Sequence, residues 1–265
     1  MDRSFYFPEE AITHRVSAGH IVTEEGPQVA RPWNVPRSIA PGGGIISNVV
    51  DQLRYAALHL GESREAGVIS RAAITAMQQA QRPAGSMCES IGTSWMLDWA
   101  GPGERLVKHG GATNGHISSF ELVPGKQFAV TVLTNADTGR ETRQTILDRC
   151  QEHFLGFAKP DPVAAAPPPN VSEYAGEYLS VLSRLAVTED QGSLTVTDMT
   201  PERGFAERRH PPILLPPAKL AFTGVDAIAV LDGQRKGERA EFLRDANGAI
   251  EWMRWDGRIA RKIAG

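Results

Sequence analysis

Cysteine and the residue patterns of metal sites are scarce in this sequence of 265 residues. It has two cysteines, Cys88 and Cys150, which are too few for a disulfide scaffold and lack C-x-x-C spacing, so we expect free thiols. Its seven histidines form no H-E-x-x-H motif or other paired ligand spacing. The sequence therefore supports neither a metal site nor a cofactor.

An excess of charge and a long apolar run are also missing. The 28 basic and 31 acidic residues leave a net charge of −3, which gives no electrostatic basis for binding nucleic acid or an anionic membrane. No apolar run has the length of about 20 residues that a transmembrane helix needs. The first eight residues lack the apolar core of a signal peptide, so we expect a cytoplasmic protein from the sequence as written.

What the chain does contain is a glycine-rich stretch between two apolar segments. Residues from Lys108 to His116 read as the end of a strand followed by a glycine-rich bend. Residues 117–134 read as a β-hairpin around a Pro124–Lys126 turn. Because glycine allows another group to approach the backbone closely, or allows a positive φ, the bend is a candidate ligand-binding edge.

This stretch resembles the third motif of serine β-lactamases and penicillin-binding-protein-like hydrolases, a family that includes class C β-lactamases, esterases and D-aminopeptidases. In that family a Lys-Thr-Gly or His-x-Gly triplet lines the active site, and His109-Gly110-Gly111 matches the second form. The segments 5–20 and 40–55 are similar to the same family. The chain thus resembles the C-terminal portion of such a hydrolase.

The resemblance implies roles for the residues of this motif. His109 would be the basic group near the substrate carboxylate or leaving group, and Gly111 would let the substrate lie against the strand. The backbone N–H of Ala112 would be one of two oxyanion-hole donors. The residues that would contact a small-molecule or peptide substrate are Gly110, Thr113, Asn114 and His116.

Two other motifs of the family are absent from the sequence. Ser-x-x-Lys would place the nucleophile and its lysine one turn apart on a helix, and neither it nor Tyr-x-Asn occurs. The resemblance therefore implies that the N-terminal strands and the nucleophile helix are lacking. The strand at Phe128–Thr134 would then expose an unpaired apolar edge, which a second chain or self-association would cover.

Three helices are expected around this hairpin. The first has Ser47 as its N-cap, the second begins at Ser70, and the third follows a capping box at Thr138–Glu141. The apolar stripe of the first helix is Val50, Leu53, Ala57 and Leu60. Together with a strand at Ile91–Trp99, the hairpin should form a three-stranded sheet on which the third helix lies.

The chain divides into parts of different composition. Residues 21–44 read as an irregular loop, and residues 159–170 as a proline-rich linker. Beyond the linker, seven short strands suggest a small antiparallel barrel, which resembles a lipocalin-like domain. The predicted class is α+β, with a partial β-lactamase-like α/β domain at 1–158, an antiparallel meander packed by helices, and an all-β barrel at 171–265.

Three functional hypotheses follow. In the first, the chain belongs to a family that transfers acyl groups on amide, ester or β-lactam substrates, and it is inactive alone because its site is incomplete. In the second, it is a non-catalytic module that binds a peptide or small ligand at the 110–115 edge or the barrel mouth. In the third, Ser118 or Ser119 acts as a local nucleophile with His109 or His116.

Overall fold

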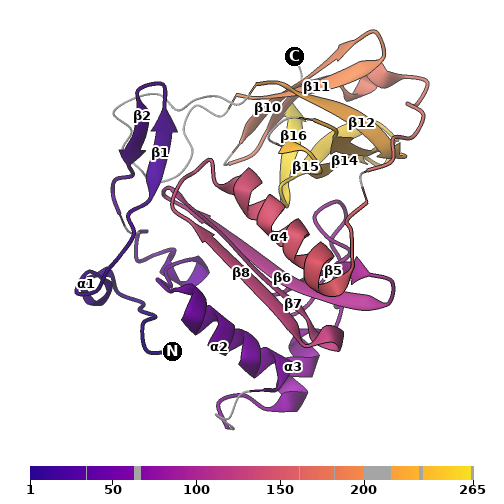
Figure 1. The fold of residues 1–265 in the computed structure, drawn as a ribbon. Helices are drawn as coiled ribbons and strands as arrows, with labels where there is room; N and C mark the ends of the chain where they lie inside the picture. The colour runs from indigo at the N-terminus through magenta and orange to yellow at the C-terminus, as the bar shows by residue number, and fades with distance from the viewer. Residues whose placement is uncertain are drawn as a thin grey trace. The chain divides into compact units, whose positions relative to one another are not determined.

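The structure is a computed structural model that describes residues 1–33, 35–62, 67–160, 162–181, 183–199, 216–232 and 235–263. Within these residues the chain divides into two compact units (Figure 1). One comprises residues 1–83 and 90–159, and the other comprises residues 84–89, 160–199 and 216–263. Each unit has its own antiparallel sheet and its own buried cluster of apolar side chains.

The first unit is built on a six-stranded antiparallel sheet in the order β3-β4-β5-β6-β7-β8. The strands are β3 (Arg82–Pro83), β4 (Ser90–Ile91), β5 (Met96–Gly101), β6 (Glu104–Thr113), β7 (His116–Val123) and β8 (Phe128–Thr134). The predicted sheet of three strands was therefore too small. The predicted strand at Ile91–Trp99 was wrong as one element, because a turn in which Ser94 has a φ of 62° separates β4 from β5.

Helix α2 (Val49–Leu60) covers one face of this sheet. It begins after Asn48, whose side chain accepts a hydrogen bond from the Asp51 N–H, so the predicted Ser47 cap is wrong by one residue. The predicted apolar stripe is also wrong in part, since Val50 and Leu53 are exposed. The cluster buried between helix and sheet consists of Ala56, Leu60, Trp95, Leu97, Val107 and Leu122.

Helix α4 (Arg140–Leu155) packs on β7 and β8 from the opposite face. The helix is where the sequence predicts it, but its N-cap is Gly139 without a side-chain hydrogen bond, so the expected capping box does not form. Helix α3 (Arg71–Met77) starts at Ser70 as predicted, where the Ser70 hydroxyl accepts a hydrogen bond from the Ala73 N–H.

The N-terminal segment lies along the start of α2 and contains α1 (Pro8–Ala11), the hairpin of β1 (His20–Thr23) and β2 (Gly26–Val29), and η1 (Ala40–Gly42). The prediction of an irregular loop over 21–44 missed this hairpin. Asp51 anchors the segment by accepting hydrogen bonds from the Arg3 N–H at 2.8 Å and the Ser4 hydroxyl at 2.9 Å. Burial alone would raise the pKa of Asp51, but these hydrogen bonds lower it overall.

The second unit is a closed barrel in which each strand pairs with the next in sequence and the last strand returns to the first. The strands are β9 (Gly176–Leu179), β10 (Arg184–Asp190), β11 (Ser193–Asp198), β12 (Ala218–Gly224), β13 (Ala227–Val230), β14 (Arg239–Arg244), β15 (Ile250–Trp255) and β16 (Arg258–Ile263). The seven strands predicted from the sequence end before β16, which closes the barrel by pairing with β9. The sequence also predicts a turn at Asp232-Gly233, of which Gly233 lies outside the described residues.

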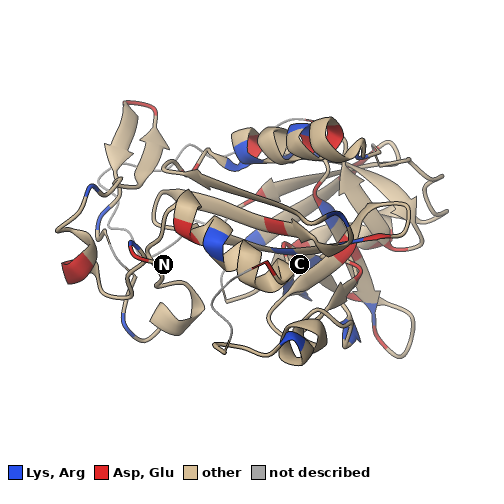
Figure 2. Ribbon diagram, turned by 60° about the horizontal axis from the view of Figure 1, so that its bottom comes forward, with Lys and Arg blue, Asp and Glu red and all other residues tan. Residues whose placement is uncertain are grey.

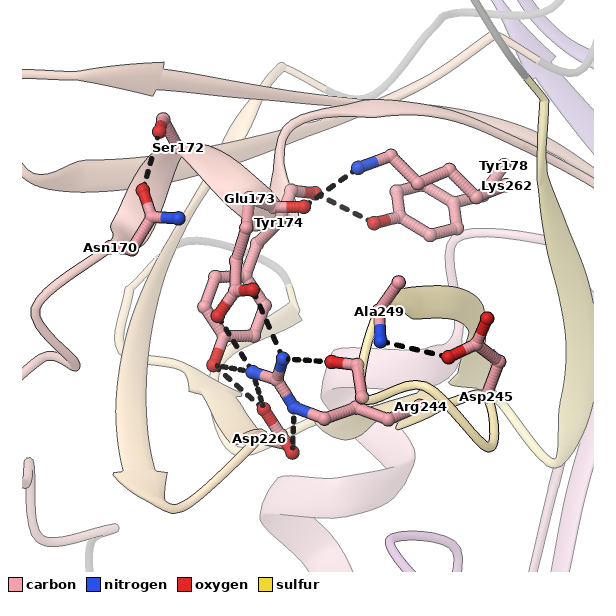
Figure 3. Close-up of polar contacts among 11 residues, drawn as sticks. Asn170, Ser172, Glu173, Tyr174, Tyr178, Asp226, Arg244, Asp245, Ala249 and Lys262 are labelled. Atoms are coloured by element: carbon pink, nitrogen blue, oxygen red, sulfur yellow. Dashed lines mark hydrogen bonds and ion pairs between the residues drawn. The ribbon is translucent and has the colours of Figure 1, made fainter.

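Apolar and aromatic side chains fill the interior of the barrel, including Tyr178, Phe222, Phe242 and Met253. Helix η3 (Val171–Tyr174) leads into β9, and the Tyr178 hydroxyl donates to the Tyr174 carbonyl at 2.7 Å (Figure 3). A barrel packed in this way has little interior space for the ligand that the second hypothesis placed at its mouth.

A polar network joins η3 to the turn between β12 and β13 and to β14. The Arg244 guanidinium donates to the carboxylates of Glu173 and Asp226, and the Tyr174 hydroxyl donates to Asp226 at 2.7 Å (Figure 3). Burial and the bond to Asp226 raise the pKa of Tyr174 to about 12. Because Arg244 binds the carboxylates of both Glu173 and Asp226, the network ties η3 to β14.

The observed architecture is α+β with a small all-β barrel, as the sequence predicts. The domain boundaries at 158 and 171 stay predictions. Within the described part of the chain, helices are too short or too polar to span a membrane. Acidic and basic residues are interspersed along the ribbon rather than gathered by sign (Figure 2).

Candidate functional site

The predicted site residues lie on the β6–β7 hairpin. His109 to Thr113 continue β6 as an extended strand paired with β7, so the predicted glycine-rich bend is confined to a two-residue turn at Asn114 and Gly115. Gly115 has a positive φ of 69°, whereas Gly110 and Gly111 do not. The sequence analysis placed the bend too early, because glycine occurs both in turns and where another group approaches the backbone, and the sequence does not distinguish these two cases.

One backbone edge of this part of β6 is open in the described chain. Strand β5 pairs with β6 only as far as Met96 opposite Lys108, so His109–Thr113 has β7 as its single partner. Thr113 and His116 flank the two-residue turn and form a hydrogen-bonded pair, and such pairs alternate along a hairpin. Gly110 and Ala112 therefore direct their N–H and C=O groups away from β7, toward the open edge.

The imidazole of His109 is exposed beside this edge. Its Nδ1 lies 2.7 Å from the Gly110 carbonyl oxygen, which can only accept, so Nδ1 carries the proton. In the neutral ring this leaves the lone pair on Nε2 available to accept a proton or a hydrogen bond. A group lying along the edge would meet the Ala112 N–H and this imidazole together.

Gly111 shares the face of the hairpin that carries His109, because side chains alternate along a strand. A Cβ atom at Gly111 would lie 2.7 Å from the Ser118 hydroxyl oxygen on β7. An alanine here would therefore force the Ser118 hydroxyl to shift, whereas the φ of Gly111 does not by itself call for glycine. Thr113 and Ala112 are exposed, which keeps the strand accessible from Gly111 to its end.

The end of the hairpin is held by the N-terminal segment. Asn114 is buried and its amide donates to the Pro32 carbonyl at 2.9 Å, while the His116 ring lies 3.2 Å from the Ser17 carbonyl. The Gly115 backbone lies against His20 and leaves no room for a Cβ atom. The structure thus gives Asn114 and His116 intramolecular partners, and their contact with substrate stays a prediction.

A buried acid lies on the other face of the hairpin, beneath α4. Glu121 is 7% exposed and accepts a hydrogen bond from the Gln151 amide at 2.7 Å. Burial raises the pKa of Glu121, although the nearby Lys108 charge opposes this shift. Lys108, the residue before His109, forms an ion pair with Asp98 at 2.9 Å. Its side chain is therefore directed away from the face that carries His109.

An aromatic cluster supports the His109 face and was not predicted as a unit. The His59 ring lies 4.5 Å from Tyr55 and 5.1 Å from Trp95, and Trp95 stacks on Phe120 at 5.8 Å, between ring centres. Phe120 is paired with His109 across the hairpin. Burial lowers the pKa of His59 and favours its neutral form. The spacing of Tyr55 and His59, four apart on one helix, was the available signal.

The serine residues of the third hypothesis differ in position. Ser119 is buried, with 7% exposure, on the face that α4 covers, whereas Ser118 is half-buried on the His109 face. The β6 edge therefore offers a backbone donor, an imidazole and an unpaired row of backbone groups. In the described residues, His, Cys, Asp and Glu do not gather in groups of three that could hold a metal ion.

Comparison with known proteins identifies relatives of this chain. The sequence model of the family described as Beta-lactamase matches residues 1–151. Penicillin-binding protein 4 of Amycolatopsis lactamdurans is 30% identical over 194 residues, which cover 67% of this chain and 50% of that protein.

Two solved structures share the fold at lower identity. The crystal structure of SurE superposes with a TM-score of 0.64 at 20% identity, over 94% of this chain and 56% of that chain. The structure of SurE with D-Leu gives a TM-score of 0.60 at 20% identity, over 85% and 52%. The chain spans about half the length of the relatives it matches. From the family match over residues 1–151 and the identity with a penicillin-binding protein, the chain belongs to the Beta-lactamase family.

Proposed function

We propose that the open edge of β6 binds an acylated or peptide-like substrate in an extended conformation, as one part of an acyl-transfer site of the β-lactamase type. The observation that carries this proposal is the outward-facing N–H of Ala112 next to the exposed His109 imidazole. A strand edge recognises an extended peptide through backbone hydrogen bonds, and a backbone N–H can stabilise a developing oxyanion. Membership of the Beta-lactamase family supports the same chemistry.

The roles within this site follow from the positions of the groups. His109 Nε2 would accept a proton at the substrate leaving group or, once protonated, donate to the substrate carboxylate, and the Ala112 N–H would donate to the acyl oxygen. Gly110 and Gly111 would let the substrate backbone lie against the strand. Thr113 is exposed beyond Ala112 and would contact the substrate at that end.

The nucleophile is the part of this chemistry that the sequence does not provide. Since Ser-x-x-Lys and Tyr-x-Asn do not occur in it, a second segment would have to bring the serine to the β6 edge. Removal of the nucleophile from a comparable hydrolase costs about 10⁶-fold in rate. We therefore infer that this chain binds substrate but does not turn it over alone.

The experiment measures hydrolysis of a chromogenic β-lactam and of a short p-nitrophenyl ester by the purified chain. A fluorophosphonate serine probe with an intact-mass readout runs alongside. We expect neither turnover nor a covalent adduct. A serine adduct that forms in the wild type and is lost in His109→Ala would show a complete site and overturn this inference.

The alternative is a non-catalytic module that binds a peptide or small ligand. The packed barrel interior favours the β6 edge over the barrel as its site. The two functions share the binding edge and differ in chemistry. Once a segment that carries the serine is supplied, only an acyl-transfer site would bind a boronic acid, which forms a tetrahedral adduct with that serine, more tightly than the parent peptide.

A further inference from the structure

The open part of β6 lies on the same side of the strand as β5. The strands follow the order β5-β6-β7, and β5 begins at Met96, opposite Lys108. A substrate bound along His109–Thr113 would therefore lie in line with β5, as an extension of that strand beyond Met96. The open stretch is about 17 Å long at the rise of about 3.4 Å per residue in an antiparallel strand.

One end of this stretch is closed by the β4–β5 turn, which consists of residues 92–95. The chain reverses there at Ser94, which has a φ of 62°. The Trp95 carbonyl accepts a hydrogen bond from the Gly92 N–H at 2.8 Å, so it is directed into the turn and away from β6. Because β5 begins directly after the turn, the turn lies level with His109.

The backbone of the β4–β5 turn is anchored to the end of α3 and to the segment after it. The Thr93 N–H donates to the Met77 carbonyl at 2.9 Å, and the Thr93 hydroxyl accepts a hydrogen bond from the Gln81 amide at 2.7 Å. A Cβ atom at Gly92 would overlap the Met77 carbonyl oxygen. The turn therefore has no room to move back toward α3.

The side chain of Trp95 holds the turn from the other direction. It is 5% exposed, and its ring packs against His59 of α2 and Phe120 of β7. Displacement of the turn would expose this large aromatic ring to water, which is unfavourable. A strand bound to the open stretch therefore has to end before the turn or leave β6.

The opposite end of the open stretch is more accessible. Gly110 is half-buried, whereas Gly111, Ala112 and Thr113 are exposed. A substrate can therefore extend toward Thr113 more easily than past Gly110 toward the turn. This difference between the two ends gives the bound substrate a direction.

The outward-facing backbone groups fix how many residues fit before the turn. Gly110 and Ala112 direct their N–H and C=O groups to the open side. In a substrate antiparallel to β6, as β5 is, the residue whose acyl oxygen accepts from the Ala112 N–H lies opposite Ala112. The next two residues lie opposite Gly111 and Gly110. A third would occupy the place of Trp95.

We propose that the β4–β5 turn limits a substrate to two residues on the leaving-group side of its acyl group. This inference rests on the proposed function, in which the acyl oxygen binds the Ala112 N–H, and adds a limit of length to it. A substrate with a third residue would have to leave the edge at Gly110 and lose the backbone hydrogen bonds there, at about two- to tenfold in affinity for each bond. The site would thus act on acyl groups close to a carboxyl end rather than in the middle of a chain.

NMR with spin-labelled peptides tests the limit. Glycine–alanine peptides of four and eight residues, N-acetylated and C-amidated, carry a nitroxide on a cysteine at one end or the other. Paramagnetic broadening is read at the amides of Ser94 and Thr113 in the ¹⁵N-labelled full chain. We expect the C-terminal label to broaden Ser94 equally at both lengths, because the turn stops this end of the peptide. The N-terminal label should broaden Thr113 strongly only in the shorter peptide, because four added residues carry it about 14 Å farther.

The outcomes separate this inference from the proposed function. A C-terminal label whose effect on Ser94 weakens with peptide length, or labels at the two ends that broaden Ser94 alike, would overturn the limit and leave binding at the β6 edge intact. Absence of broadening at both amides with every peptide would overturn the limit together with the proposed function. Ala112→Pro, which deletes the outward N–H, should abolish the broadening, whereas Ala112→Ser should preserve it.

Discussion

Replacement of Gly111 by alanine tests why a glycine stands in the middle of the candidate site. The new Cβ would lie 2.7 Å from the Ser118 hydroxyl oxygen, closer than van der Waals contact allows. Relief of such an overlap costs about 1–3 kcal/mol, against a gain of about 0.4–1 kcal/mol from a less flexible unfolded chain. We expect the free energy of unfolding to fall by about 1 kcal/mol, the difference between these two effects.

The assay is a double-mutant cycle measured by urea denaturation with tryptophan fluorescence. Ser118→Ala removes the oxygen that the new methyl group meets. Gly111→Ala should therefore lower the free energy of unfolding by about 1–2 kcal/mol less in the Ser118→Ala background than in the wild type, and this difference is the coupling energy. Gly42→Ala is the control, since Gly42 lies in the helix η1 and its Cβ would have no neighbour within 4 Å, and it should cause no loss of stability. A Gly111→Ala variant as stable as the wild type, or a loss that Ser118→Ala leaves unchanged, would refute the close contact.

Three further predictions concern buried polar groups. Tyr178→Phe removes the hydroxyl that donates to the Tyr174 carbonyl and should lower the free energy of unfolding by about 1–2 kcal/mol in urea denaturation; no change would contradict the role of this bond. Glu121→Gln tests the raised pKa of the buried acid: the folded wild type should lose stability as pH rises from about 4.5 through that raised pKa. Thermal melts of the variant should therefore be higher than wild type at pH 7 and equal at pH 4, and a lower melting temperature at pH 7 would count against this reading. Asp51→Ala should release residues 2–4, seen as faster amide hydrogen exchange at Arg3, and unchanged exchange there would exclude the anchor.

The sequence predicted those elements whose signals are local. Ser70 caps a helix as expected, Gly61 ends α2, and the barrel strands follow the turns at Gly192 and Gly248. These residues act through backbone propensity, which a single sequence carries. The last strand, β16, was missed because Arg258–Ile263 mixes charged and apolar residues, and it is held as a strand by pairing with β15 and β9.

The residues of the candidate site stay a prediction, and their geometry was not foreseen from the sequence. The His109-Gly110-Gly111 motif lies on the β6–β7 hairpin, and its extended conformation is decided by pairing with Phe120, Ser119 and Ser118 on β7. The sequence also did not show which residues of helix α2 are buried. Leu53 follows the apolar period of α2 but is 45% exposed, whereas Asp51 breaks the period and is buried by the N-terminal segment.

The contacts of the hairpin end could not be read from the sequence either. Asn114 meets Pro32, a residue 82 positions away, and His116 meets Ser17. Such contacts depend on how the N-terminal segment folds back over the hairpin, for which a single sequence carries no periodic signal.

Titration of the ¹⁵N-labelled chain with N-acetyl-glycyl-D-leucine, followed by NMR, tests the central claim that the β6 edge binds an extended acyl group. The account predicts that the amide signals of Gly110 and Ala112 and the His109 imidazole shift together. Ala112→Pro, which deletes the outward N–H, should abolish the shifts, whereas Ala112→Ser, which keeps it, should not. Binding that is undiminished in Ala112→Pro, or shifts confined to residues outside the β6–β7 hairpin, would contradict the account.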